Sequence, residues 1–182
     1  MKRYFRRMRG STRNSKRQSL SEILWSWLCS FLGIYAIWMV NAYLGVQENE
    51  NLFLIGSFGA SAVLIYGAPG AELSQPRNLV GGHMVSALAG ILAYKLLPNH
   101  IGLAAAVAVS VAIAGMHLTQ TLHPPGGATA LIAVIGGDSI HELGFLYMFK
   151  PILIGVLIML AVALIVNNFS PSQTRHYPKH WF

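Results

Sequence analysis

The chain has 182 residues, of which 54% are hydrophobic and only 10% are charged, and its formal net charge is +7. A soluble globular domain usually carries roughly 25% charged residues, so this composition argues against a soluble enzyme, a disordered chain and a coiled coil. The single cysteine, Cys29, excludes a disulfide framework within the chain and any multi-cysteine zinc site. The apolar content is therefore expected to face lipid.

Positive charge is concentrated at the two ends of the chain. Eight of the thirteen Lys and Arg residues lie within the first seventeen positions, and Arg175 and Lys179 lie near the C-terminus. A basic run before an apolar stretch is the usual signal for a cytoplasmic end, and we favour it over nucleic-acid binding. The acidic segments 47–51 and 138–142 are expected on the external side.

Apolar stretches of two lengths follow each other along the chain. Four have about the 20 residues that a helix needs to cross a bilayer: 23–44, 79–97, 101–122 and 145–166. Two are shorter: 52–68 and 127–137. The second of these would be only roughly 16 Å long as a helix, so it cannot span a bilayer alone.

An internal repeat relates the two short stretches, because residues 59–65 resemble residues 127–133 at an offset of 68. The sequence thus predicts an all-α integral membrane protein with six transmembrane segments, four long and two short or broken, in two pseudo-repeats of three. Three crossings in each repeat would make the repeats inverted, whereas re-entrant short segments would make them parallel.

These stretches divide the chain into a membrane region and two tails. We expect the protein in an inner (plasma) membrane, with both ends of the chain in the cytoplasm. The divisions are a basic N-terminal tail (1–20), a transmembrane domain (21–168, with repeat one at about 21–97 and repeat two at about 101–167) and a C-terminal tail (169–182).

The strongest local motif lies just before the second short stretch. Pro124 and Pro125 are expected to stop the preceding helix and to suit the first turn of the next one. Gly126 and Gly127 have no side chains that would cover their backbone N–H groups. We therefore predict a broken helix whose short second half begins inside the membrane, behind His123, with bare amides.

Such a helix start is an anion site in outline, because it offers unpaired N–H donors and about half a positive charge. The repeat supplies a second start at Ser57, Phe58 and Gly59. Two such ends near the midplane would bind an anion, as discontinuous transporter helices do. The alternative is that these glycines only allow close helix packing.

Three further polar residues have a functional and a structural interpretation. Arg77 would attract an anion at the mouth of a pathway, or it would only mark a helix end at the interface. Lys150 has the same two interpretations. An intramembrane histidine such as His83 is expected to be functional, because burying it is costly. Together with His117 and His123 it would relay a proton or tune the electrostatic field.

The complete set of predicted substrate-binding residues is Ser57, Phe58, Gly59, Ser61, Arg77, Asn78, His83, His117, Thr121, His123, Pro124, Pro125, Gly126, Gly127, Thr129 and Lys150. We expect no catalytic residue, metal site or cofactor, because every apolar stretch lacks an Asp or Glu that could serve as a base or ligand. An intramembrane enzyme is accordingly the minority interpretation.

Small residues at every fourth position predict close helix contacts, at positions 82, 86 and 90 and at positions 104, 108 and 112. These rows would support a homo-oligomer, a dimer or trimer, or they would pack within one chain. The residues expected to anchor the chain at the membrane interface are Tyr4, Trp25, Trp27, Trp38, Tyr94 and Tyr147.

The segment from His123 to Leu131, which begins His-Pro-Pro, resembles the motif after which the HPP family of integral membrane proteins is named. Segments 56–64 and 75–78, followed by Gly81-Gly82-His83, resemble other shared blocks of that family, and the resemblance covers about residues 20–168. It implies transport of nitrite or a similar small anion. It also implies four spanning helices, which differs from the six segments predicted above.

We therefore predict a membrane transporter or channel for a small monovalent anion, with nitrite as the first candidate, bound where the two short helices begin. The partners expected are this anion, the lipid bilayer and further copies of the chain, and no nucleic acid. The alternative is a membrane scaffold or ligand-binding protein that transports nothing.

Overall fold

The computed structural model describes residues 17–43 and 56–182, and the regular structure in this part is helical, without a strand. The α-helices are α2 (Leu20–Tyr43), α3 (Gly56–Gly67), α4 (Pro76–Leu96), α5 (Ile101–Leu118), α6 (Pro125–Ile135), α7 (Asp138–His141) and α8 (Ile154–Phe169). Short helical turns are η2 (Glu72–Ser74), η3 (Gly144–Met148), η4 (Phe149–Leu153) and η5 (Gln173–Arg175). The predicted all-α class is confirmed for the described residues.

Four helical segments are long and apolar enough to cross a bilayer: α2, α4, α5 and the run Gly144–Phe169, which ends in α8. The helices α3 and α6 have 12 and 11 residues, which makes them about 18 and 16 Å long. A hydrocarbon core is about 30 Å thick, so neither crosses it alone. The expected four long and two short segments are present, while their grouping into two repeats stays a prediction.

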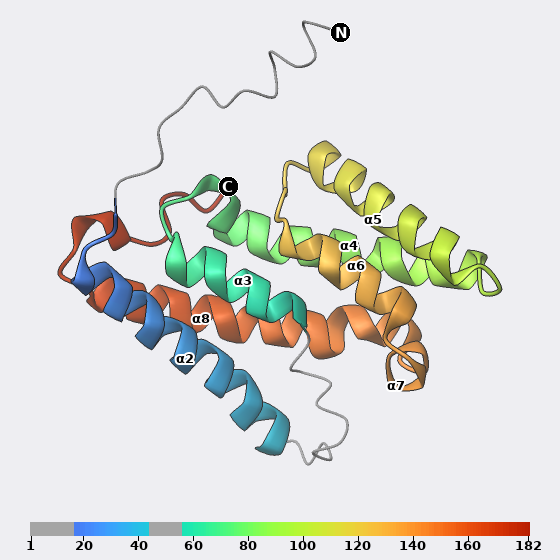
Figure 1. The fold of residues 1–182 in the computed structure, drawn as a ribbon, viewed down its shortest axis with the longest axis horizontal. Coiled ribbons are helices and arrows are strands. Elements are labelled where there is room, and N and C mark those ends of the chain that lie inside the picture. Colours follow the sequence, from blue (N-terminus) through green and yellow to red (C-terminus); the bar gives the residue numbers. More distant parts are fainter. Residues whose placement is uncertain (1–16, 44–55) are drawn as a thin grey trace, which may run out of the picture.

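The start of α2 and the end of α8 lie at the same end of the molecule (Figure 1). This placement requires an even number of crossings between them, as the charge pattern predicts. The basic residues 1–16 and the acidic segment 47–51 lie outside the described residues. The assignment of this end to the cytoplasm therefore stays a prediction.

The break between α5 and α6 begins earlier than the prolines predict. Gln120 takes a left-handed φ of 55°, the amide of Thr121 donates to the Met116 carbonyl at 2.8 Å, and the amide of Gln120 donates to the His117 carbonyl at 3.2 Å. These two bonds form a Schellman motif, which ends α5. The proline pair therefore does not stop α5. Instead, Pro125 is the first residue of α6, where its missing N–H costs nothing.

The small residues of α4 allow α6 to pack closely against it. A Cβ atom built on Gly90 would lie 2.5 Å from the Ala130 carbonyl oxygen and 2.7 Å from Ala133 Cβ. The small residues of α5 face the same pair of helices and are fully buried: Ala104, Ala108 and Ala112. Both rows are therefore packing faces within one chain, and they do not support the predicted oligomer.

The segment after α8 folds back onto the bundle through Arg175, whose side chain is only 1% exposed. Its Nη1 lies 2.9 Å from the Glu22 carboxylate at the start of α2, and its Nη2 lies 3.0 Å from Asn167 Oδ1 in α8. Nη2 also donates to the Tyr66 carbonyl in α3. A buried charge is costly unless it is paired and hydrogen-bonded, so these bonds tie the ends of three helices together.

The same segment holds the loop between α3 and α4. The Tyr177 hydroxyl donates to the Ser74 carbonyl at 2.9 Å, and the Lys179 amide donates to Gln75 Oε1 at 2.8 Å. Burial raises the pKa of the Tyr177 phenol, so this group remains a neutral donor at physiological pH. The expected C-terminal tail is therefore packed against the helices over at least part of its length.

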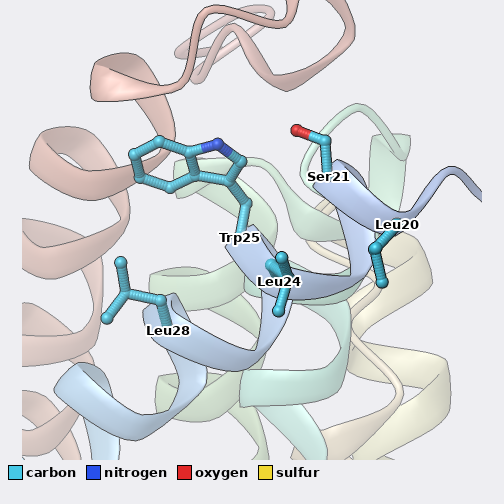
Figure 2. A pocket seen from close by; sticks show the side chains of 5 residues that line it. All are labelled: Leu20, Ser21, Leu24, Trp25 and Leu28. Carbon is cyan, nitrogen blue, oxygen red and sulfur yellow. The ribbon is translucent and has the colours of Figure 1, made fainter.

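The outer face of α2 is strongly apolar. A surface hollow of about 400 Å³ is lined by five side chains from its first turns: Leu20, Ser21, Leu24, Trp25 and Leu28 (Figure 2). Because one helix supplies all of them and most are apolar, we assign this hollow to the surface that contacts the lipid bilayer.

Gly90→Ala tests the close contact of α4 with α6. We expect it to lower the free energy of unfolding by about 1–3 kcal/mol, because the new methyl group would meet the Ala130 carbonyl oxygen at 2.5 Å. Gly102→Ala is the matched control, because a Cβ there meets nothing within 4 Å. Unfolding in mixed micelles titrated with SDS measures both, and equal stability of the two variants would contradict the packing.

Candidate functional site

Four polar side chains form a hydrogen-bonded group inside the bundle, here called the histidine cluster: Ser61, His83, His123 and Thr129. Ser61 Oγ lies 2.8 Å from His83 Nε2 and 2.9 Å from His123 Nε2, so one hydroxyl joins both imidazole rings. His83 Nδ1 lies 2.7 Å from Thr129 Oγ1. All four residues are 0% exposed.

The surroundings of the cluster assign a direction to each hydrogen bond when both rings are neutral. His123 Nδ1 lies 2.8 Å from the Leu73 carbonyl oxygen, which only accepts, so Nδ1 carries the proton and Nε2 accepts from Ser61. The Ser61 oxygen then accepts from His83 Nε2–H, and His83 Nδ1 accepts from Thr129. The donors therefore point one way along the chain of bonds, from Thr129 to the Leu73 carbonyl.

Each member of the cluster is positioned by a different element. Ser61 lies in the second turn of α3, His83 in the third turn of α4, and Thr129 in the second turn of α6. His123 lies in the break before α6. It fits there because Gly82 has no side chain: a Cβ on Gly82 would lie 2.5 Å from His123 Cβ.

The cluster lies where the two short helices begin. Figure 1 shows α3 and α6 starting near the middle of the long axis of the molecule and running toward opposite ends. The hydrogen bond between Ser61 and His123 joins the first turns of α3 to the residues just before α6. Both helices therefore direct their positive dipole ends toward the middle of the bundle.

An apolar ring covers one side of the cluster. The Phe58 ring meets His83 edge-on at 5.8 Å between centroids, and a Cβ on Gly155 of α8 would lie 2.3 Å from Phe58 Cε2. Ser57 lies one turn before Ser61 on the same face of α3. Its buried hydroxyl has no hydrogen-bond partner among the described residues. A free polar atom therefore lies on the face of α3 that also carries Ser61.

The amides at the start of α6 are not bare, contrary to the prediction. The Gly126 amide donates to the His123 carbonyl at 2.8 Å, and the Gly127 amide donates to the Pro124 carbonyl at 3.0 Å. Gly126 is also covered by α4, since its Cβ would meet Ser86 Oγ at 2.6 Å. Turn hydrogen bonds thus satisfy these donors, and only the dipole of α6 remains to favour an anion.

Arg77 and Asn78 lie at the start of α4 and hold the residues that follow α5. Arg77 Nη2 donates to the Thr119 carbonyl at 2.9 Å and to Gln120 Oε1 at 3.1 Å. Asn78 Nδ2 donates to the Leu122 carbonyl at 2.9 Å. Both residues therefore hold the segment that leads to the cluster, although neither contacts an imidazole ring.

The remaining predicted site residues make no side-chain hydrogen bond to the histidine cluster. His117 is exposed on α5, and Lys150 is exposed at a non-helical position before α8, with φ −134° and ψ 107°. Thr121 is buried, but its hydroxyl pairs with Thr119 Oγ1 at 2.7 Å. Gly59 and Pro124 are exposed, whereas Pro125 is buried as the first residue of α6.

Two groups that form hydrogen bonds to residues of the cluster were not predicted from the sequence. One is the Leu73 carbonyl, and a backbone atom leaves no signal in a sequence. The other is Tyr147, whose hydroxyl donates to the Thr129 carbonyl at 3.1 Å. Tyr147 is expected to anchor a helix at the membrane interface, whereas its side chain is buried inside the bundle, with 0% exposed. A tyrosine inside an apolar stretch is a weak signal for a buried hydroxyl that needs a partner.

One pair in the cluster can be compared with a catalytic dyad. Ser61 and His123 have the spacing of a nucleophile and its base, but both are fully buried and the ring is oriented by a carbonyl in place of a carboxylate. Within residues 17–43 and 56–182, no three His, Cys, Asp or Glu side chains come together as a metal site would need.

Thr129→Val tests the hydrogen bond between Thr129 and His83. The valine keeps the shape of the side chain but leaves His83 Nδ1 buried without a donor, which should cost about 1–3 kcal/mol of unfolding free energy. Thr129→Ser is the control, because it keeps the hydroxyl, and it should lose clearly less stability. Unfolding in mixed micelles distinguishes them, and a valine variant as stable as the serine variant would contradict the bond.

Two transmembrane proteins of Dictyostelium discoideum are similar to the chain, with 49% and 44% identity in alignments that cover 98% of it. The match covers 57% and 63% of their own lengths, so the chain spans about three fifths of the curated relatives it matches. No solved structure matches the chain significantly. The transmembrane region of the HPP family matches residues 15–178. The chain is therefore a multi-pass membrane protein that belongs to the HPP family, which confirms the resemblance found in its sequence.

Proposed function

We propose that the chain carries a small monovalent anion, with nitrite as the first substrate to test, across a membrane together with a proton. The observation that carries this proposal is the pair of buried histidines joined through the Ser61 hydroxyl. An ionisable side chain inside a membrane bundle is costly and by default marks an ion or proton pathway. The choice of nitrite rests on the family resemblance alone, because the relatives are described only as transmembrane proteins.

Proton binding and anion binding would strengthen each other at the cluster. With both rings neutral, each ring nitrogen has a partner, so a second proton on either ring adds an uncompensated charge. The groups that contact the rings are uncharged: Phe58, Ser61, Thr129 and the Leu73 carbonyl. A monovalent anion would supply the missing counter-charge, and by linkage each ligand would raise the affinity for the other.

Two local features favour an anion over a cation as the accompanying ion. The starts of α3 and α6 direct positive dipole ends toward the cluster, which stabilises negative charge there. The buried Ser57 hydroxyl has no partner in the described residues and can donate to an oxygen of the ion. The proposal includes no chemical conversion of the ion, so the protein would act as a transporter and not as an enzyme.

The same proposal includes an architecture and an orientation. We place the start of α2 and the end of α8 in the cytoplasm of an inner membrane, on the positive-inside rule. We group α2, α3 and α4 as one repeat and α5, α6 and α8 as a second, inverted one. The opposite directions of α3 and α6 in Figure 1 support this grouping. Assembly into a dimer or trimer remains a prediction.

A scaffold or ligand-binding membrane protein is the second candidate. It is favoured by the complete burial of the cluster, whose side chains already satisfy each other and would serve as a polar core. The two candidates differ in whether a solute crosses the membrane, so a flux measurement separates them.

Nitrite uptake into proteoliposomes under an inward proton gradient tests the transporter. We expect uptake by the wild type, and a loss of roughly tenfold or more for His83→Gln and His123→Gln, which corresponds to about 1.4 kcal/mol of lost stabilisation. His100→Gln is the matched control, because His100 is exposed between α4 and α5, and it should transport like the wild type.

Three results would contradict the proposal. Absence of wild-type uptake, with the protein folded and inserted, would favour the scaffold. A wild-type rate that does not change when the proton gradient is removed would exclude the coupling. Normal uptake by both folded histidine variants would remove the cluster from the pathway.

A further inference from the structure

A polar cavity of about 530 Å³ lies at the end of the bundle where α4 begins and α5 ends. Its polar lining includes Arg77, Asn78, Gln120 and His180, the last of which comes from the folded-back C-terminal segment. A water molecule takes about 30 Å³ of liquid volume, so a small ion fits here with part of its hydration shell.

Two apolar residues that line the cavity, Leu73 and Leu122, adjoin the histidine cluster. The Leu73 carbonyl accepts the hydrogen bond from His123 Nδ1, and Leu122 directly precedes His123 in the chain. The cavity therefore ends next to the ring that closes one end of the chain of hydrogen bonds.

Arg77 is the charged group in this lining that is suited to an anion. Its two hydrogen bonds within the described residues both use Nη2, and a guanidinium has further N–H donors. Among the same residues the one salt bridge joins Arg175 to Glu22, so Arg77 has no carboxylate within 4.0 Å. Glu72 also lines the cavity, but it is exposed whereas Arg77 is half-buried, so water screens its charge more strongly.

We propose that this cavity is the vestibule through which the transported anion reaches the cluster, and that Arg77 is its first binding group. This inference rests on the proposed function and adds a place of entry to it. Leu73 and Leu122 form the partition that must move before the ion meets His123. The ligand class is a small monovalent oxyanion, which the planar N–H fork of Arg77 matches.

The rates at which a cysteine in the vestibule reacts with an anionic and with a cationic reagent test the proposal without measuring transport. Leu122→Cys is labelled with two methanethiosulfonates of similar size, one carrying a sulfonate and the other a trimethylammonium group. Cys29 is buried, so the unsubstituted chain is the blank. Adding Arg77→Gln should lower the ratio of sulfonate to trimethylammonium rates by at least about fivefold, the effect of one charge near 4 Å in water.

Lys95→Gln is the matched control, because it removes the same charge about 27 Å further along α4 and should leave the ratio unchanged. Nitrite should slow the sulfonate reagent when Arg77 is present, and it should have no effect after Arg77→Gln. If Leu122→Cys does not fold, His180→Cys gives the same readout from the C-terminal side of the cavity.

The vestibule proposal would be overturned if the rate ratio did not change after Arg77→Gln, or if nitrite still slowed the sulfonate reagent without Arg77. Normal nitrite uptake in the same protein would leave the proposed transport intact. A ratio that falls as expected in a protein without nitrite uptake would support the anion site and contradict transport. The two proposals therefore fail separately.

Discussion

A polar group buried in this bundle is costly unless it finds a partner, because the apolar interior and the lipid around it offer none. The histidine cluster meets this requirement with one hydroxyl between two rings. Ser61 can accept from His83 and donate to His123 at the same time, and the Leu73 carbonyl fixes which nitrogen of His123 carries the proton. The same requirement explains Arg175, which is buried only because the ends of three helices surround it with acceptors.

The position of the cluster follows from the lengths of the helices. The helices α3 and α6 are too short to cross a bilayer, and both begin near the middle of the bundle (Figure 1). Their second turns therefore bring Ser61 and Thr129 to the two histidines. Close packing then completes the site: Gly82 lets His123 approach α4, and Gly155 lets Phe58 cover His83. The site thus depends on glycines and short helices as much as on its polar residues.

Much of this arrangement can be predicted from the sequence. Hydropathy gives the four long and two short segments, and His83, His123, Ser61 and Thr129 are all among the predicted site residues. The rest depends on contacts between distant segments. No pattern indicates that the Leu73 carbonyl orients His123, that the Tyr147 hydroxyl donates to the Thr129 carbonyl, or that the amides of α6 are satisfied by the preceding turn. These outcomes depend on backbone acceptors, which a sequence does not distinguish from one another.

The most direct test of the histidine cluster is its protonation pattern in a lipid bilayer. Solid-state ¹⁵N spectra of histidine-labelled protein, assigned through His83→Gln and His123→Gln, report which ring nitrogen carries the proton. The chain of hydrogen bonds requires His123 to be protonated at Nδ1 and His83 at Nε2. The same tautomer in both rings, or rings that exchange freely with water like exposed histidines, would contradict the account.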